Sequence, residues 1–409
     1  MALSSLNITD IRLSKRIAII GGGIVGLSLG MKLGQKFKNS RVTIFEKESK
    51  IGLHQSGRNS GVLHCGLGYR TGTLKARLAV DGINQMVNFC QKNNVAYDIC
   101  GKVVVANSES EIKNIINLAA QGKSNGLDGI KFLNNTELSK REPNVRAKKS
   151  LLVPGEGIVD FKGVMSVLAS FIKENNGEIL TSSTVKKVEE VNNSNIVHYK
   201  DGPKEFDLVF NCSGLHSDRI YYKSTGKKSH LKIIPFRGDY LKFKDKYKEI
   251  LNHLVYPVPD SKYPFLGVHF TRMINGDREV GPNAVLAFKR EGYSFKDFSL
   301  DDMLETLFYK GFYKFISKNL FFSLRELGTS LSDIIFINQA KKLIPDINSS
   351  MFDKGISGVR AQTITNTGEL FLDFGIYRNK NQVHILNAPS PGATASLAIA
   401  DYVIKNYCD

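Results

Sequence analysis

The sequence is poor in the features that mark secreted, metal-stapled or membrane-spanning proteins. Its 409 residues include five cysteines, an odd number, and no Cys-x-x-Cys spacing. We therefore expect neither a disulfide framework nor a metal site, and the cysteine usage fits a reducing compartment. No run of about 18 apolar residues occurs, so no membrane-spanning helix is expected.

Targeting and nucleic-acid-binding segments are also missing. The first apolar strand begins near Arg16 without a hydrophobic stretch before it, which leaves little room for a targeting peptide. The 56 basic and 39 acidic residues give a net charge of +17, and a basic protein can bind nucleic acid, anionic lipid or acidic substrates. Because the lysines are scattered and no arginine-rich run or RNA-binding aromatic motif occurs, we expect no nucleic-acid partner.

What the sequence does have, near its start, is a glycine-rich turn between a strand and a helix. The apolar, β-branched residues 16–20 predict a buried parallel strand, and the apolar periodicity up to Leu33 predicts a helix. Gly21 permits the turn, Gly23 lets the backbone approach a pyrophosphate, and Gly26 lets the helix pack closely on the strand. Phosphates would bind at the helix N-terminus, where free N–H groups and the helix dipole favour negative charge.

A second strand and a polar segment extend this pattern. Residues 42–45 form an apolar strand that ends in Glu46, 20 positions after Gly26, where a carboxylate accepts a hydrogen bond from a ribose hydroxyl. Residues 52–66 are rich in Gly, Ser and Asn, so their backbone could lie against a flat ring or phosphates; the alternative is a plain surface loop. We therefore predict a Rossmann-like domain that binds one dinucleotide.

The remaining pattern predicts an α/β chain with two domains. We expect helices at 74–90, 109–122 and 164–173, a hairpin over 179–199, and a return to the first sheet at the strand 206–211. Short aromatic strands between 231 and 288 predict a mixed or antiparallel sheet in a substrate domain. Our predicted boundaries are 14–95, 151–222 and 335–409 for a discontinuous cofactor-binding domain, and 96–150 and 223–334 for the substrate domain.

Three further segments have predictions of their own. We expect a loop at 154–160, a lead into a hairpin at 358–362, and a final helix that begins near Gly392. Residues 298–331 are helical in pattern and combine aromatic residues, Phe321 and Phe322 among them, with lysines. Such a segment can lie on an anionic membrane surface, but packing on the core is the simpler reading.

Five segments together resemble a known group of flavoenzymes. They are the polar loop 56–64 and the stretches 256–260, 265–272, 281–288 and 387–396. With the Gly21 turn and the Glu46 strand, they resemble the D-amino-acid-oxidase (DAO) superfamily of FAD enzymes and, within it, the L-2-hydroxyglutarate dehydrogenase/oxidase family. The resemblance extends from Arg16 to the end of the chain.

The resemblance implies noncovalently bound FAD and oxidation of a dicarboxylate, L-2-hydroxyglutarate, to 2-oxoglutarate. Another 2-hydroxy acid or an amino acid as substrate is the alternative, and a non-catalytic or RNA-modifying flavoprotein is disfavoured by the lack of a basic cluster. The cofactor contacts that follow are Gly21, Gly23, Ile24, Val25, Gly26, Glu46, Lys47, Ser60, Gly61, Val62, Val185, Cys212, Ser213, Gly214, Pro391, Gly392, Ala393 and Thr394.

Residues for the chemistry follow from the same resemblance and from the reaction. Arg360 matches the arginine that pairs with the substrate carboxylate and Tyr256 a tyrosine that supports it, while Arg272 is our candidate for the distal carboxylate. Alcohol oxidation also needs a proton acceptor, a role that suits histidine. His64 and His269 are the candidates, with His269 ranked first and His64 alternatively positioning the flavin.

The same family resemblance bears on partners and location. It implies that electrons pass to a membrane quinone, another acceptor or oxygen. We therefore expect a cytoplasmic protein, with peripheral contact at an inner membrane (mitochondrial in a eukaryote) as an open alternative. The oligomeric state has no signal in the sequence.

Overall fold

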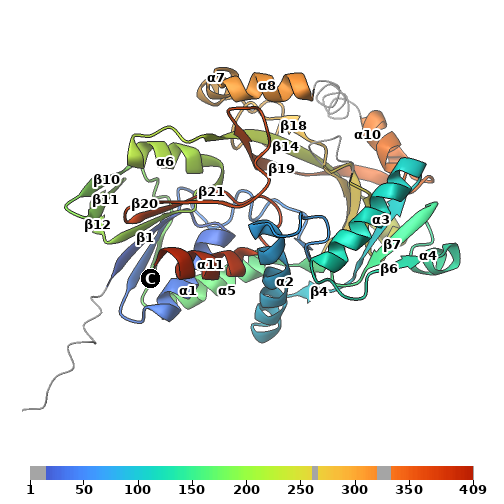
Figure 1. Cartoon of the computed structure of the whole chain (residues 1–409), viewed down its shortest axis with the longest axis horizontal. Helices are drawn as coiled ribbons and strands as arrows, with labels where there is room; N and C mark the ends of the chain where they lie inside the picture. The colour runs from blue at the N-terminus through green and yellow to red at the C-terminus, as the bar shows by residue number, and fades with distance from the viewer. Residues whose placement is uncertain (1–14, 260–265, 320–332, 409) are drawn as a thin grey trace, which may run out of the picture.

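The computed structural model describes residues 15–259, 266–319 and 333–408. Within these ranges the chain is an α/β protein built on two large sheets (Figure 1). The predicted fold class, a Rossmann-like unit combined with a mixed sheet, is confirmed. The predicted residues Asp260, Phe265, Phe321 and Phe322 lie outside the described ranges.

The first sheet has six strands in the order β20-β21-β13-β1-β2-β9. Their bounds are β1 Arg16–Ile20, β2 Arg41–Phe45, β9 Glu178–Leu180, β13 Leu208–Asn211, β20 Gly375–Asn379 and β21 Gln382–Asn387. All neighbours are parallel except β20 and β21. The chain thus returns to this sheet at β13, as predicted, and parallel strands place their carboxyl ends along one edge.

Helices and a small sheet cover the two faces of this sheet (Figure 1). On one face lie α1 Ile24–Lys36, α2 Leu74–Lys92, α5 Phe161–Glu174 and α11 Ser396–Tyr407. On the other lie α6 Ser217–Thr225 and the antiparallel strands β10 Lys187–Val191, β11 Ser194–Tyr199 and β12 Gly202–Phe206. The predicted hairpin is therefore β10–β11, because β9 belongs to the parallel sheet.

The second sheet has nine strands and is almost wholly antiparallel, with one parallel pair, β15 and β5. Its strands are β5 Lys102–Ala106, β6 Lys131–Leu133, β7 Lys149–Val153, β14 Leu231–Phe243, β15 Leu254–Pro257, β16 His269–Arg272, β17 Arg278–Gly281, β18 Val285–Leu286 and β19 Phe352–Thr365. Side chains alternate between its faces. One face carries an apolar core with Val103, Val255 and Phe270, and the other faces the first sheet.

One predicted segment is confirmed and one is only partly right. Residues 358–362 lie inside β19, which pairs with β14 over most of its length. They lead into a tight hairpin turn, as predicted, because Ile364 forms an antiparallel bridge with Leu370 and the Thr365 N–H donates to the Glu369 carbonyl. Residues 154–160 are not entirely loop, because β8 Gly157–Val159 pairs with β3 Val62–Leu63 and β4 Tyr97–Asp98. β19 thus belongs to the second sheet although we assigned 335–409 to the cofactor domain, and the domain boundaries stay a prediction.

The other helices lie around the second sheet (Figure 1). They are α3 Glu109–Ser124, α4 Asn135–Arg141, α7 Leu300–Leu307, α8 Lys310–Lys318, α10 Asp333–Ala340 and the short η3 Asp245–Ile250 and η4 Ser349–Met351. The short η2 Gly214–His216 follows β13 of the first sheet and also contacts β14 and β19 of the second. Phe312 and Phe315 of α8 pack on β14 and β19, as the core-packing interpretation predicts. In the described part of the chain, no helix combines the length and apolarity needed to cross a bilayer.

Candidate active site

A large cavity lies between the carboxyl edge of the first sheet and the inner face of the second. Its volume is about 1720 Å³, more than the roughly 300–1,000 Å³ of an ordinary small-molecule site. Gly21 and Glu46 line it from the ends of β1 and β2, and Tyr256 and His269 line it from the second sheet. The space is therefore large enough for a dinucleotide together with a small substrate.

Most of the predicted cofactor contacts come together on this cavity. Those that line it are Gly21, Gly23, Ile24, Val25, Glu46, Lys47, Ser60, Val62, Val185, Cys212, Ser213, Gly214, Pro391, Gly392, Ala393 and Thr394. Gly26 and Gly61 are not among the lining residues. Gly26 serves packing instead, because a Cβ there would lie 2.1 Å from the Gly21 carbonyl oxygen.

Glycine backbone and one buried carboxylate form the part of the cavity that fits a dinucleotide. Gly21 has φ +112°, and a Cβ on it would lie 2.5 Å from the Cys212 carbonyl oxygen, so only glycine fits this turn. Glu46 is buried and accepts hydrogen bonds from the backbone N–H groups of Gly22 (2.8 Å) and Glu48 (2.9 Å). The carboxylate oxygens keep lone pairs that can accept from ribose hydroxyls.

The polar loop and the C-terminal turn meet at one threonine. The Thr394 hydroxyl accepts from the His64 N–H (3.3 Å) and donates to the Val62 carbonyl (3.2 Å). Our prediction that the last helix begins near Gly392 is wrong, since 390–395 form turns and α11 starts at Ser396. The cavity therefore meets the turn before the helix rather than its first turn.

A buried ion pair joins the polar loop to the second sheet. Lys102 Nζ lies 2.6 Å from Glu156 Oε1, and both side chains are buried. Glu156 Oε2 lies 3.5 Å from His64 Nδ1. Burial would raise the pKa of Glu156, but Lys102 and His64 outweigh it and lower that pKa to about 2. The carboxylate is therefore ionised at any ordinary pH.

His269 and Tyr256 stack on each other beside this pair, with ring centroids 4.0 Å apart. His269 Nδ1 lies 3.1 Å from the Gly267 carbonyl oxygen. Since a carbonyl can only accept, Nδ1 carries the proton and Nε2 has the lone pair. Burial, reinforced by the positive charges of Arg360 and Lys102, lowers the pKa of His269 to about 3, so this imidazole is neutral.

Arg360 lies in the middle of β19, paired in register with Phe236 of β14, and lines the cavity. Its neighbour Tyr240 is half-buried and its hydroxyl is hydrogen-bonded to Arg360 and Ser60. Burial raises the pKa of Tyr240, although the Arg360 charge opposes this. A guanidinium held in this way can bind a carboxylate through two parallel hydrogen bonds.

The structure does not bring Arg272 to the cavity. Its Nη1 lies 2.9 Å from Asp98 Oδ2, with both side chains partly exposed, and also contacts the Asn252 carbonyl. Arg272 is absent from the cavity lining. The geometry therefore disfavours its assignment to the distal carboxylate, because Asp98 of β4 already pairs with the guanidinium.

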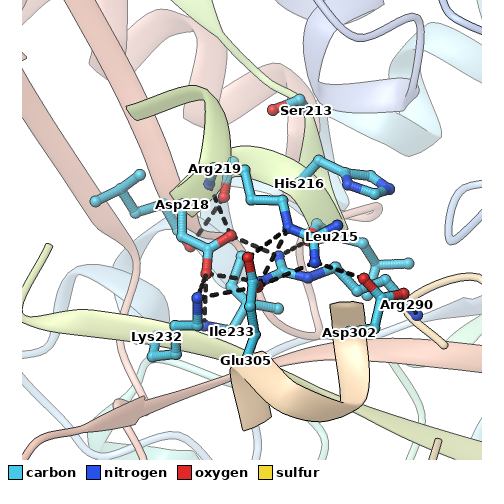
Figure 2. Close-up of polar contacts among 12 residues, drawn as sticks. Ser213, Leu215, His216, Asp218, Arg219, Lys232, Ile233, Arg290, Asp302 and Glu305 are labelled. Atoms are coloured by element: carbon cyan, nitrogen blue, oxygen red, sulfur yellow. Dashed lines mark hydrogen bonds and ion pairs between the residues drawn. The ribbon is translucent and has the colours of Figure 1, made fainter. Parts of the chain in front are cut away.

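A buried ionic network, hereafter the Arg290 network, holds the segment that follows the Cys212–Gly214 turn (Figure 2). Arg290 lies 2.5 and 3.0 Å from the two Asp218 oxygens and 2.9 Å from Glu305, and it also donates to the Leu215 carbonyl. The other members are Arg219, Lys232 and Asp302. The network joins η2 and α6 of the first sheet to α7, which fixes one wall of the cavity.

A second polar cluster lies just beyond Glu46. Glu48, His54 and Glu291 could each offer one ligand atom to a metal ion, and these atoms lie within 4.8 Å of one another. The Lys47 ammonium lies among them, 2.8 Å from Glu291 and 3.0 Å from His54 Nε2, and also pairs with Glu48. Because an ammonium already supplies the positive charge here, the cluster is a salt-bridge network around a residue that we assigned to the cofactor.

Sequence reasoning missed Glu156, Lys102 and Tyr240. Lys102 stands at the start of an apolar strand and Glu156 stands between two glycines. Both positions are equally typical of exposed residues, at the end of a strand and in a loop. The only available signal was the alternation of β5, which places Lys102 on the same face as Val104 and opposite the apolar Val103. The partner in the pair, 54 residues away, left no signal in the sequence.

Comparisons with known proteins agree with this architecture. Residues 16–405 match the family of FAD-dependent oxidoreductases named DAO. The chain is 42% identical to the L-2-hydroxyglutarate dehydrogenase of Indibacter alkaliphilus over 95% of this chain and 98% of that protein. It is 38% identical to the L-2-hydroxyglutarate dehydrogenase of Escherichia coli K12 over 95% of this chain and 92% of that one.

Among solved structures, the fold is similar to the FAD-bound, dithionite-reduced L-α-glycerophosphate oxidase of Mycoplasma pneumoniae. The TM-score is 0.78 at 22% sequence identity, over 96% of this chain and 94% of that chain. At this identity the likeness concerns the fold alone.

Proposed function

Because the chain belongs to the family of FAD-dependent oxidoreductases (DAO), we propose that it oxidises L-2-hydroxyglutarate to 2-oxoglutarate, with noncovalently bound FAD accepting the hydride. The observation that carries the substrate assignment is the 42% identity to a bacterial L-2-hydroxyglutarate dehydrogenase over nearly the whole chain. The cavity is lined by Arg360, Tyr240 and Tyr256, and by the histidines His64 and His269, which supports the same chemistry.

The residues that would hold the cofactor follow from the cavity lining. The Gly21–Val25 turn would bind the pyrophosphate through backbone N–H groups, and Glu46 would accept from the adenosine ribose. The loop around Ser60 and Val62 and the turn at Pro391–Thr394 would border the isoalloxazine ring. The predicted contacts of Lys47, Val185 and Cys212–Gly214 complete the set, and Gly26 and Gly61 would act through packing.

Arg360 would bind the carboxylate next to the reacting carbon. Tyr240 holds the guanidinium from one side, and Tyr256 would support the bound carboxylate. A substrate fixed in this way presents its hydroxyl to the side of the cavity that carries His64 and His269, the two candidates for proton acceptor.

The test is anaerobic flavin reduction by L-2-hydroxyglutarate, followed by stopped-flow absorbance. Arg360→Ala should weaken apparent substrate affinity roughly 10- to 100-fold, because hydrogen bonds between charged groups contribute about 1.5–3 kcal/mol. Arg272→Ala is the matched control, since Arg272 pairs with Asp98 outside the cavity, and its affinity should not change. Reduction by lactate or an amino acid, with none by L-2-hydroxyglutarate, would replace the substrate by the alternative class.

We also propose that the enzyme passes its electrons to a membrane quinone and touches the bilayer through α7 and α8. Phe308 is 81% and Tyr313 58% exposed, and the lysines Lys310 and Lys314 are exposed beside them. Exposed aromatic rings next to lysines suit the interface of an anionic membrane.

Vesicle flotation measures this contact. The protein should float with phosphatidylglycerol vesicles at low salt and less with phosphatidylcholine, and the variant Phe308→Ser/Lys314→Glu should stay at the bottom of the gradient. Phe132→Ser is the control, because Phe132 on β6 is also exposed (41%) and its ring centroid lies 4.6 Å from Nζ of Lys149 on β7. Equal flotation of both variants would show that α7 and α8 do not form the membrane contact. Oxygen or a soluble acceptor would then be the expected electron acceptor.

A further inference from the structure

Two of the four histidines that line the cavity, His64 and His269, differ in the group that faces their Nδ1 atom. Behind His269 Nδ1 is a neutral backbone carbonyl, at 3.1 Å. Behind His64 Nδ1 is a carboxylate oxygen, Glu156 Oε2, at 3.5 Å. Only a charged partner can offset the positive charge that an imidazole gains with a proton, so the two rings are unequal as proton acceptors.

The carboxylate behind His64 is kept charged and in place by the protein. Glu156 is 1% and Lys102 6% exposed, and the 2.6 Å contact between Lys102 Nζ and Glu156 Oε1 occupies one carboxylate oxygen. Among the residues that the structure describes, Oε2 has no hydrogen-bond partner closer than His64. A buried ionised oxygen without another partner favours a donor, and the nearest one available is the Nδ1–H of His64.

We propose that Glu156 is a positioning residue that acts through His64: it holds the His64 proton on Nδ1 and leaves Nε2 as the base for the substrate hydroxyl. This inference rests on the proposed alcohol oxidation. In the step, the hydroxyl proton moves to His64 Nε2, the electron pair of the O–H bond forms the second C–O bond, and the C2 hydrogen leaves with its own electron pair as hydride to the cofactor. The charge of Glu156 then stabilises the imidazolium.

Lys102 and His269 acquire defined roles in this arrangement. Lys102 pairs with one oxygen of Glu156 and lies 5.0 Å from the centroid of the Tyr256 ring, so it connects Glu156 to the substrate side of the second sheet. His269 is neutral beside the charges of Arg360 and Lys102, so a proton on its Nε2 would be strongly unfavourable. Its Nε2 lone pair suits hydrogen bonding to the substrate hydroxyl, which reverses the ranking of the two histidines.

A double-mutant cycle of anaerobic flavin reduction tests the inference. His64→Gln should slow reduction roughly 10²–10⁴-fold and Glu156→Gln roughly 10²-fold, as for a lost general base. If Glu156 acts through His64, adding Glu156→Gln to His64→Gln costs nothing further. If the rate loss of the double variant equals the product of the two single losses, Glu156 acts independently of His64, and the proposal would be overturned. Glu142→Gln is the control, since Glu142 Oε1 pairs at 2.8 Å with His253 in a buried Glu–His pair outside the cavity.

A second measurement needs no turnover. In the oxidised holoenzyme, the ¹⁵N signals of the His64 ring, assigned by their loss in His64→Gln, should show the Nδ1–H tautomer in the wild type and the Nε2–H tautomer in Glu156→Gln. An unchanged tautomer would refute the role of Glu156. If Glu156→Gln does not fold because Lys102 is left unpaired, Lys102→Met/Glu156→Gln replaces it. Failure of L-2-hydroxyglutarate to reduce the wild-type flavin would reject the proposed substrate, and the tautomer would still decide this inference.

Discussion

Replacing Arg290 by methionine is expected to lower the free energy of unfolding by roughly 3–5 kcal/mol, because it removes the closest counter-charge of the buried Asp218 and leaves, among the described residues, only Lys232, at 3.6 Å. Arg290 is 2% exposed and Asp218 7%, and the two form a two-pronged pair at 2.5 and 3.0 Å. Burial raises and Arg290 lowers the pKa of Asp218, and the net shift is downward, so the aspartate is ionised when folded. Urea unfolding followed by far-UV circular dichroism would measure the loss.

Two controls separate this effect from the removal of any arginine. Arg16→Met removes a guanidinium that pairs with Glu205 and Asp207 at the surface, and an exposed pair contributes only about 0–1 kcal/mol. Arg290→Met/Asp218→Asn removes both charges and should recover part of the stability. If Arg290→Met and Arg16→Met lower the free energy of unfolding by the same amount, the Arg290 network does not stabilise the fold through buried charge. Lower FAD occupancy in Arg290→Met should accompany the destabilisation, since the network fixes the segment after Gly214.

The second large effect concerns a carboxylate that the enzyme carries at a cost. Glu279 on β17 is 6% exposed, and one of its oxygens, Oε2, has no hydrogen-bond partner among the described residues. Burial, and then repulsion from Asp277, raise its pKa to about 7, although Lys242 opposes them. Because the folded-state pKa lies above the unfolded value, the folded protein holds this proton more tightly, so stability falls as pH rises from about 4.5 to about 7.

Glu279→Gln should therefore stabilise the protein in a pH-dependent way. The displacement from 4.5 to about 7 corresponds to roughly 3 kcal/mol at pH 8, and the gain should shrink to below about 1 kcal/mol at pH 5. Urea unfolding of both proteins at the two pH values measures the difference. A gain of equal size at pH 5 and pH 8 would attribute it to packing or hydrogen bonding of the amide instead.

Local patterns predicted the part of the molecule that surrounds the cofactor. The Gly21–Gly26 turn, the strand before Glu46 and the helix predicted at 74–90 follow from spacing and periodicity within about 20 residues. The structure has all three, with the helix extended to Lys92. Arg360 and Tyr256, assigned by resemblance, do line the cavity. Their chemical roles remain proposals.

What the sequence could not predict depends on distant partners. In the sequence, an arginine that binds substrate cannot be told from one that forms an ion pair at the surface. Only the structure shows that Arg272 pairs with Asp98. The turn that follows 358–362 was predicted, but the pairing of these residues with β14 was not, because β14 lies more than a hundred positions earlier in the sequence. Glu156 looks like a loop residue because neither Lys102 nor His64 is near it in sequence. A charged residue in a sequence does not reveal which distant residue of opposite charge it pairs with.

The Thr394 hydroxyl, which bridges the backbone at His64 and Val62, also determines when the site can exist during synthesis. β1 and β2 are made first, but their sheet is extended by β13 and β21, and the polar loop receives its last hydrogen bond only from a residue made 330 positions after His64. A ribosome-bound chain that has not yet reached Thr394 therefore has the glycine turn but an open cavity. We therefore expect the cofactor to bind late in synthesis. Until the C-terminal segment has been made, the edge of this sheet that β21 later covers stays unpaired, and apolar residues of the sheet stay exposed.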